Sequence, residues 1–248
     1  MPQASSVESP AKVSTTTAAE LVARLGLPPC TWGLPTADDI DGGDLIAVGA
    51  DLRPETLVTA YASGLFPMAV SRRRLGWWSP DPRGVLPIDG LIVSKSLRRS
   101  QRRYTVTIDR CFADVVGICA SMPRPHGWIT KDIISAYVGL AELGIAHSVE
   151  AWDEGGSLVG GLYGVNLGGL FAGESMFQRA TDASKVALVA LVELLSPCEG
   201  ALLDVQWCTD HLATLGVIAI PRADYLTRLP EALDASPPIA FGAPRSLP

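Results

Sequence analysis

The chain contains 248 residues, of which 48% are hydrophobic, so it can bury a substantial core as one large or two small domains. Its formal net charge of -6 argues against a nonspecific nucleic-acid binder, because such proteins are basic throughout. The five cysteines lack the two-residue spacing of zinc sites, and no apolar run approaches the roughly 20 residues that span a bilayer. We therefore expect a soluble cytoplasmic protein with reduced thiols and no bound metal.

Composition divides the chain into four parts. Residues 1–17 are rich in Ser, Thr, Ala and Pro without a hydrophobic period, which is typical of a disordered tail. The Pro-rich segment 236–248 is expected to be a flexible C-terminal tail for the same reason. Between the tails we expect a small N-terminal domain over residues 18–82 and a larger domain over residues 83–235.

The first domain is predicted to contain a helix that follows a short apolar run. The apolar run is Leu45–Val48, and Gly49 and Asp51 come after it. Pro54 can open a helix, because its missing N–H is not needed in the first turn, and Gly64 can end it. The chain then enters a segment rich in arginine and tryptophan, which includes Arg72–Arg74 and Trp77–Arg83.

The second domain is predicted from its periodicity to be a sheet layered with helices. Its three central strands follow one another through Gly-rich turns, so they should form an antiparallel meander. In chain order, the expected elements are strand 104–108, helix 112–121, a helix capped by Thr130, strands 146–152, 158–165 and 170–177, helix 182–195, strand 201–206, helix 210–215 and strand 217–220. This order indicates the α+β class.

Five basic residues recur at helical spacing near the start of the second domain. They share one face if residues 95–103 form a helix, and no acidic residue interrupts them: Lys95, Arg98, Arg99, Arg102 and Arg103. Like charges at this density favour a docking surface for phosphates. The alternative is an ordinary solvated face with counter-charges nearby.

Three polar residues stand out within apolar strands. An ionised Glu174 is costly in its apolar segment unless it is paired or partly solvated. The alternative is that Glu174 points to solvent from a sheet edge. Asp204 and Gln206 are two residues apart and so share a strand face, where an acceptor and an amide can hold an amine. The alternative is that they satisfy neighbouring backbone groups.

Six motifs agree, in order and spacing, with one protein family. The motifs are Trp77–Arg83, Gly127–Thr130, Ala146–Glu150, Val159–Val165, Gly173–Phe177 and Asp204–Gln206. Together they resemble bacterial leucyl/phenylalanyl-tRNA–protein transferases over about residues 45–225. The resemblance implies a small N-terminal α/β domain followed by an acetyltransferase-like (GNAT-like) catalytic domain with a mixed sheet.

The resemblance also implies the reaction. Such enzymes transfer Leu or Phe, with Met as a further donor, from aminoacyl-tRNA to the α-amino group of proteins that begin with Arg or Lys, which marks them for degradation in the N-degron pathway. No metal or organic cofactor is implied. Asp204 and Gln206 would be the catalytic pair, with either one as the proton acceptor. Glu174 would help to position the reacting amine or ester.

The binding residues are implied in the same way. Trp128 would lie beside the terminal adenosine of the tRNA, and Met176 would line the apolar pocket for the transferred side chain. Met68 stands where some members of the family have a tryptophan, and a thioether covers an adenine face with less area and no ring stacking. The basic face of residues 95–103 would hold the acceptor stem.

Two other functions compete with this interpretation. A CoA-dependent acyltransferase of the GNAT class would share the fold, but that class binds pyrophosphate at a Gly-rich turn before a helix. Residues 178–181, which precede the predicted helix at Asp182, contain no glycine. A noncatalytic tRNA-binding module would explain the basic face but would give no reason for Glu174 or for the Asp204 and Gln206 pair.

Overall fold

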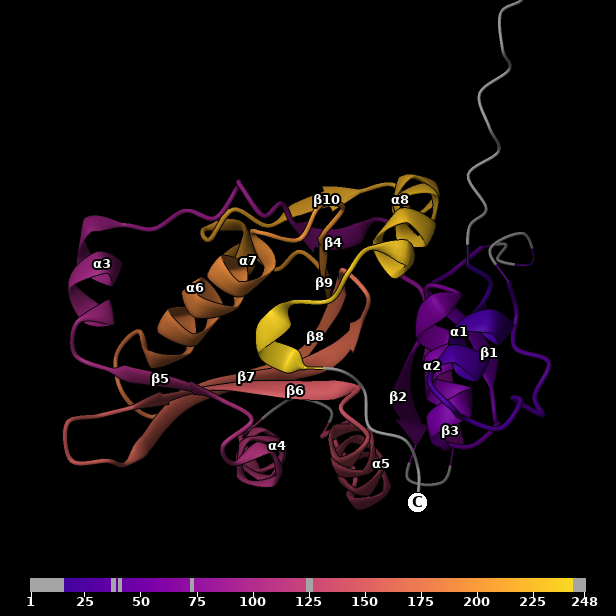
Figure 1. Ribbon diagram of the computed structural model, residues 1–248, viewed down its shortest axis with the longest axis horizontal. Coiled ribbons are helices and arrows are strands. Elements are labelled where there is room, and N and C mark those ends of the chain that lie inside the picture. The colour runs from indigo at the N-terminus through magenta and orange to yellow at the C-terminus, as the bar shows by residue number, and fades with distance from the viewer. Residues whose placement is uncertain (1–15, 37–38, 40–41, 72–73, 124–126, 243–248) are drawn as a thin grey trace, which may run out of the picture.

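The computed structural model describes residues 16–36, 39, 42–71, 74–123 and 127–242 (Figure 1). Residues 1–15 of the predicted N-terminal tail and residues 243–248 of the predicted C-terminal tail lie outside the described residues, as do Arg72 and Arg73. The described part contains two sheets, a small one at one end of the molecule and a large one that carries most of the helices (Figure 1).

The small sheet is antiparallel, with the strand order β1-β3-β2. Its elements and the helices beside it are α1 (Ala18–Arg24), β1 (Leu45–Val48), α2 (Pro54–Ala62), β2 (Phe66–Ser71) and β3 (Arg74–Trp78). The predicted helix is confirmed as α2, and the apolar run Leu45–Val48 forms β1, whereas the β2–β3 hairpin was missed. Trp77 is fully buried and its indole N–H donates to the carbonyl of Gly49 at 2.9 Å, so this tryptophan supports the fold.

The large sheet has seven strands in the order β10-β4-β9-β8-β7-β6-β5. All neighbours pair antiparallel except β8 and β9, which are parallel. The strands are β4 (Arg83–Leu86), β5 (Thr105–Ile108), β6 (Ala146–Trp152), β7 (Leu158–Leu167), β8 (Leu170–Gln178), β9 (Leu202–Gln206) and β10 (Ile218–Ile220). The predicted meander is confirmed as β6, β7 and β8, whereas β4 was missed. The sheet is therefore mixed.

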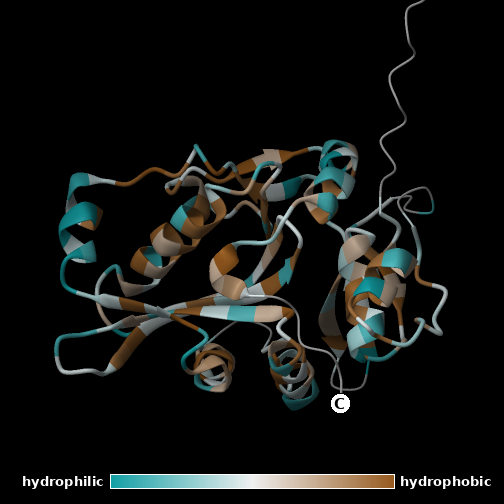
Figure 2. Cartoon of the chain, viewed as in Figure 1, coloured by the Kyte–Doolittle hydropathy of each residue, from teal (hydrophilic) through white to brown (hydrophobic). Residues whose placement is uncertain are grey.

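Helices cover both faces of the large sheet. They are α3 (Lys95–Gln101), α4 (Phe112–Ser121), α5 (Lys131–Glu142), α6 (Ala183–Leu195), α7 (Asp210–Ala213) and α8 (Arg222–Asp234), followed by the 3-10 helix η2 (Ile239–Phe241). The core on one face contains buried side chains of α2, α4, α5 and α8, and the core on the other contains those of α6. Figure 2 shows hydrophobic residues along the strands and α6, whereas α3 is largely hydrophilic. None of the described helices is long and apolar enough to cross a membrane.

The chain after α8 packs back onto the large sheet. Residues 236–242 belong to the segment that was expected to be flexible, and they include η2. Phe241 is buried and its ring stacks on that of His147, with 4.2 Å between the ring centroids. The end of the described chain is thereby held against β6.

Candidate active site

The parallel pairing between β8 and β9 is short. It runs from Leu170 opposite Leu202 to Ala172 opposite Asp204 and ends there. Glu174 on β8 therefore stands two residues past the last pair, and Gln206 on β9 does the same.

An irregularity in β8 coincides with Glu174. Gly164 of β7 lies opposite Gly173, and the preceding Tyr163 lies opposite Ser175, so Glu174 has no opposite residue on β7. An extra residue of this kind is a β-bulge, which bends the strand and redirects the side chain. The bulge turns Glu174 toward the helices that supply the tyrosines described below.

A second bulge lies across the site in β9. Gly84 of β4 lies opposite Gln206 and Val85 lies opposite Asp204, which leaves Val205 as the extra residue. Gln206 has a positive φ of 62°, a region that residues with a side chain rarely adopt. The backbone N–H of Gln206 donates to Oδ1 of Asp204 at 2.9 Å, which holds this turn in place.

Asp204 is bonded to a buried arginine. Nε of Arg83 donates to Oδ1 of Asp204 at 2.9 Å, and Nη2 donates to Oδ2 at 2.6 Å, while both side chains are only 1% exposed. The hydroxyl of Tyr225 donates to Oδ2 at 3.1 Å. Burial alone would lower the pKa of the Arg83 guanidinium, but Asp204 and Tyr225 beside it raise that pKa overall. Together with the Gln206 N–H, each oxygen of Asp204 accepts two hydrogen bonds.

The side chain of Gln206 is buried with an unused donor. Only 7% of the residue is exposed, and its Nε2 has no hydrogen-bond partner among the described residues. A buried polar group without a partner costs about 1–3 kcal/mol, so its presence indicates a place where a substrate acceptor can bind.

Glu174 is held by two phenols from different parts of the chain. The hydroxyl of Tyr61 on α2 donates to Oε1 of Glu174 at 2.6 Å and also forms a hydrogen bond with the hydroxyl of Tyr137 on α5. Burial raises the pKa of Glu174 to about 7, although the hydrogen bonds from the two tyrosines oppose this rise. Burial also raises the pKa values of Tyr61 and Tyr137 well above the ordinary value of a phenol. Glu174 can therefore exchange a proton near neutral pH, whereas the phenols keep theirs.

The structure places the predicted binding residues in three separate regions. Met68 lies half-buried on β2, and Trp128 lies half-buried in the loop before α5. Met176 is partly buried and packs against the core on the α6 face of the sheet. Glu174 points instead toward the opposite face, where Tyr61 and Tyr137 belong to the core. Met176 and Glu174 therefore line different faces of β8.

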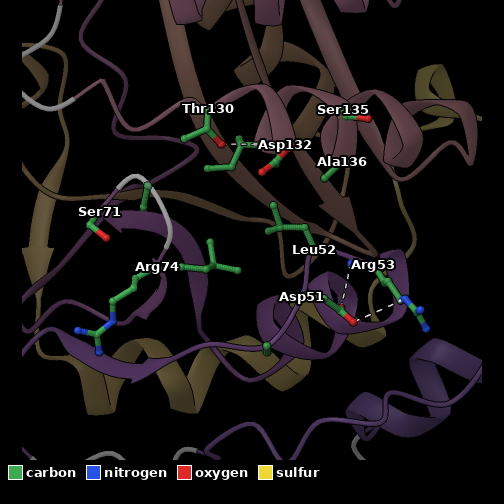
Figure 3. A pocket seen from close by; sticks show the side chains of 13 residues that line it. Asp51, Leu52, Arg53, Ser71, Arg74, Thr130, Asp132, Ser135 and Ala136 are labelled. Carbon is green, nitrogen blue, oxygen red and sulfur yellow. Dashed lines mark hydrogen bonds and ion pairs between the residues drawn. The ribbon is translucent and has the colours of Figure 1, made fainter.

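A pocket of about 520 Å³ lies between the small sheet and α5 (Figure 3). Figure 3 shows Thr130, Asp132 and Ser135 from the start of α5 on one side, with Asp51 and Arg74 across from them. The lining does not include Glu174 or Gln206. Trp128 is two residues before Thr130, so the predicted nucleoside-binding residue adjoins this pocket in sequence.

The predicted basic face lies on and just after α3. Ser94 caps the helix through a hydrogen bond from the N–H of Leu97 at 3.1 Å. All five basic side chains from Lys95 to Arg103 are exposed. The helix is attached to α6 through Ser100, which donates to Asp182 at 2.9 Å. In Figure 1, α3 lies at the end of the molecule opposite the small sheet, so the face is remote from the pocket.

Four residues of the site were not predicted: Arg83, Tyr225, Tyr61 and Tyr137. Arg83 was noted only as part of the Trp77–Arg83 motif, because β4 was not predicted and its acidic partner lies 121 residues away in the sequence. Tyr61 and Tyr137 occur in apolar helical patterns, which carry no sign of their hydroxyl partners, and Tyr225 lies in α8, which was not predicted. Among the described residues, no group of three or more His, Cys, Asp and Glu side chains could hold a metal ion.

Comparison with known proteins gives a consistent result. The family model described as leucyl/phenylalanyl-tRNA protein transferase matches residues 85–230, and the model of the N-terminal domain of the same family matches residues 50–81. A leucyl/phenylalanyl-tRNA–protein transferase of Anaeromyxobacter sp. (strain Fw109-5) is 53% identical over 205 residues, which cover 81% of this chain and 87% of that protein. The protein of the same name from Pseudoalteromonas atlantica is 47% identical over 213 residues, with 84% and 90% covered.

Among solved structures, L-PGS from Bacillus licheniformis covers 65% of this chain and 55% of its own, at 12% identity and a TM-score of 0.35. That similarity is too low to support a conclusion about fold or function. The family model spans more than half of the chain, and the relatives match it over most of their length. This chain therefore belongs to the leucyl/phenylalanyl-tRNA–protein transferase family.

Proposed function

We propose that this protein transfers Leu or Phe from charged tRNA to the α-amino group of proteins that begin with Arg or Lys, which marks them for degradation in the cytoplasm. Membership of the family supports the reaction class. The observation that carries the assignment to a site is the convergence of Glu174, Asp204 and Gln206 where the β8–β9 pairing ends.

The chemistry asks for positioning and for movement of one proton. The nucleophile is an α-amine with an ordinary pKa near 7.7–8.0, and the aminoacyl ester is already activated. As the N–C bond forms, the amine must lose a proton. As the ester C–O bond breaks, the tRNA hydroxyl must gain one. A group whose pKa lies near neutrality can do both.

Glu174 fits that proton-transfer role in the proposed mechanism. Its pKa of about 7 allows it to accept a proton from the amine and to return one to the leaving hydroxyl. The phenols of Tyr61 and Tyr137 would hold the carboxyl in place through their hydrogen bonds.

Gln206 and Asp204 have different roles in this proposal. The unpartnered Nε2 of Gln206 can donate to the ester carbonyl oxygen, where negative charge develops during attack. Asp204 already accepts four hydrogen bonds and so is poorly placed to act as the base. We therefore propose that Asp204 orients Gln206 through the hydrogen bond from its backbone N–H.

We propose further that the tRNA extends from the site along the molecule. The exposed basic face of α3 would hold phosphates of the acceptor stem, and the pocket lined by Thr130, two residues after Trp128, would receive the terminal nucleoside. Met176 is proposed to contact the transferred side chain from the α6 face of β8, with Met68 near the nucleoside.

The catalytic domain is proposed to have a GNAT-like fold. The mixed sheet, with its single short parallel pair between β8 and β9, supports this assignment. The two family models meet between residues 81 and 85, which supports a domain boundary near residue 82.

Transfer can be tested with the purified protein, Leu-tRNA labelled in its leucine, and a peptide that begins with Arg. We expect label in the peptide, and none in the same peptide when its amino group is acetylated. A second control replaces Leu-tRNA by acetyl-CoA. Acetylation of the peptide would instead support a CoA-dependent enzyme, and tRNA binding without transfer would support a noncatalytic module.

A further inference from the structure

Arg83 connects the site to its surroundings through a short chain of contacts. Two of its hydrogen bonds go to Asp204, and a third goes from Nη1 to the carbonyl of Gly64 at 3.0 Å. Its guanidinium also lies over the rings of Tyr225 at 4.4 Å and Phe66 at 5.0 Å. The guanidinium is therefore held by hydrogen bonds to Asp204 and Gly64 and by contacts with two aromatic rings.

Such a buried ion pair is not explained by stability alone. Removing two charges from water costs about as much as their attraction returns, and well-packed apolar residues often stabilise a core equally well. What the pair provides is a carboxylate in one fixed orientation. Asp204 in turn holds the N–H of Gln206, whose left-handed backbone needs such a restraint.

We infer that Arg83 is a positioning residue for aminoacyl transfer. It acts through Asp204, which holds the backbone of Gln206 so that the side-chain amide of Gln206 faces the substrate. The inference rests on the proposed role of Gln206. Two parallel N–H donors match both carboxylate oxygens, so the planar guanidinium fixes the carboxylate about its own axis. A lysine ammonium would keep the charge and lose this orientation.

The chain offers a matched control in Arg222, which is also buried. Its Nη1 donates to the carbonyl of Ser79 at 2.6 Å, its Nη2 donates to that of Gly42 at 2.9 Å, and it pairs with Asp81 at 3.9 Å. The hydrogen bonds and ion pairs of Arg222 do not involve Glu174, Asp204 or Gln206. Loss of its guanidinium should therefore lower stability without changing turnover.

The test compares Arg83→Lys and Arg222→Lys in the full-length protein, with kcat expressed per folded molecule from circular dichroism melts. We expect kcat of Arg83→Lys to fall about tenfold or more, while KM for Leu-tRNA stays within about twofold. Arg222→Lys should melt at a lower temperature with kcat unchanged. In a Gln206→Ala background, Arg83→Lys should cause little further loss, because residues that act as a unit are not additive.

Wild-type kcat in folded Arg83→Lys, or full additivity with Gln206→Ala, would overturn the inference while leaving the proposed function intact. Wild-type kcat in Gln206→Ala itself would refute the proposed role of Gln206 and the inference with it. If Arg83→Lys does not fold, Tyr225→Phe replaces it under the same criteria. That change removes one hydrogen bond to Asp204 and keeps the ring beneath Arg83, so kcat should fall about threefold or more.

Discussion

Glu174 and Gln206 each stand two residues beyond the last paired residues of two parallel strands, where Glu174 is the extra residue of one β-bulge and Gln206 follows the extra residue of another. One presents a carboxyl with a pKa near 7, and the other presents a buried amide donor without a partner among the described residues. The same departure from regular sheet geometry thus supplies a proton-transfer group and a hydrogen-bond donor. The following predictions concern this arrangement and the surfaces around it.

Glu174→Gln should abolish the pH dependence that Glu174 confers on turnover. Because the pKa of Glu174 is about 7, its base form is lost as the pH falls through neutrality, so wild-type kcat should decrease toward pH 6. The amide cannot accept the proton, and kcat at pH 8 should fall about 100-fold or more. Single-turnover transfer rates between pH 6 and 9 measure both effects. An unchanged profile in the folded variant would exclude Glu174 as the titrating group.

The same substitution should change how stability depends on pH. The pKa of Glu174 is about 7 in the folded protein and 4.5 ordinarily, so the folded state keeps a proton that the unfolded state loses. Stability should therefore decrease as the pH rises from about 4.5 to 7, by an amount on the order of 3 kcal/mol. Urea unfolding should show a smaller decrease for Glu174→Gln. The exposed Glu231→Gln serves as control and should retain the wild-type slope.

Gly84→Ala should disturb the bulge that holds Gln206. A Cβ at Gly84 would lie 2.6 Å from the carbonyl carbon of Trp207 and 2.7 Å from the backbone N of Cys208, so this backbone must move. We expect kcat to fall about tenfold or more, together with the melting temperature. Gly117→Ala, where a Cβ meets nothing within 4 Å, is the matched control and should leave kcat unchanged. Equal kcat in both variants would show that the Gly84 contact does not set the site geometry.

Charge removal on α3 should weaken tRNA binding without changing which amino acid is transferred. Arg98→Ala with Arg102→Ala should raise KM for Leu-tRNA and reduce the slope of log KM against log salt, because fewer counterions are released. The single change Arg98→Ala can be compared with Arg228→Ala, an exposed arginine on α8. If Arg228→Ala matched Arg98→Ala in its effect, the docking surface would not be specific to α3.

The meander and α6 could be predicted because their evidence is local. Gly-rich turns separate the strands from Ala146 to Gln178, and the apolar period of α6 is uninterrupted. Helix α8 was missed because six of its 13 residues are charged or polar and Pro230 lies inside it. The hairpin of β2 and β3 was missed because Pro67 and the arginines obscure the strand pattern.

The candidate site was only partly predictable for a different reason. Glu174, Asp204 and Gln206 could be identified as polar residues in apolar strands and from the family motifs. Their partners could not, because the Arg83–Asp204 pair joins positions 121 residues apart. Tyr61 and Tyr137 meet Glu174 only after three separate elements pack together. The bulges also interrupt the strand alternation on which the prediction of a shared face for Asp204 and Gln206 depended.

The most direct test of the account is the single-turnover rate of Leu transfer by folded Gln206→Ala at saturating Leu-tRNA and Arg-leading peptide. We predict a rate about 100-fold or more below wild type, with the Kd for Leu-tRNA within about twofold, since Gln206 is proposed to act on the reacting ester. Asp204→Ala should give a similar loss, and the double variant should be little worse than the worse single one. A near-normal rate in folded Gln206→Ala would contradict the account and place the chemistry elsewhere.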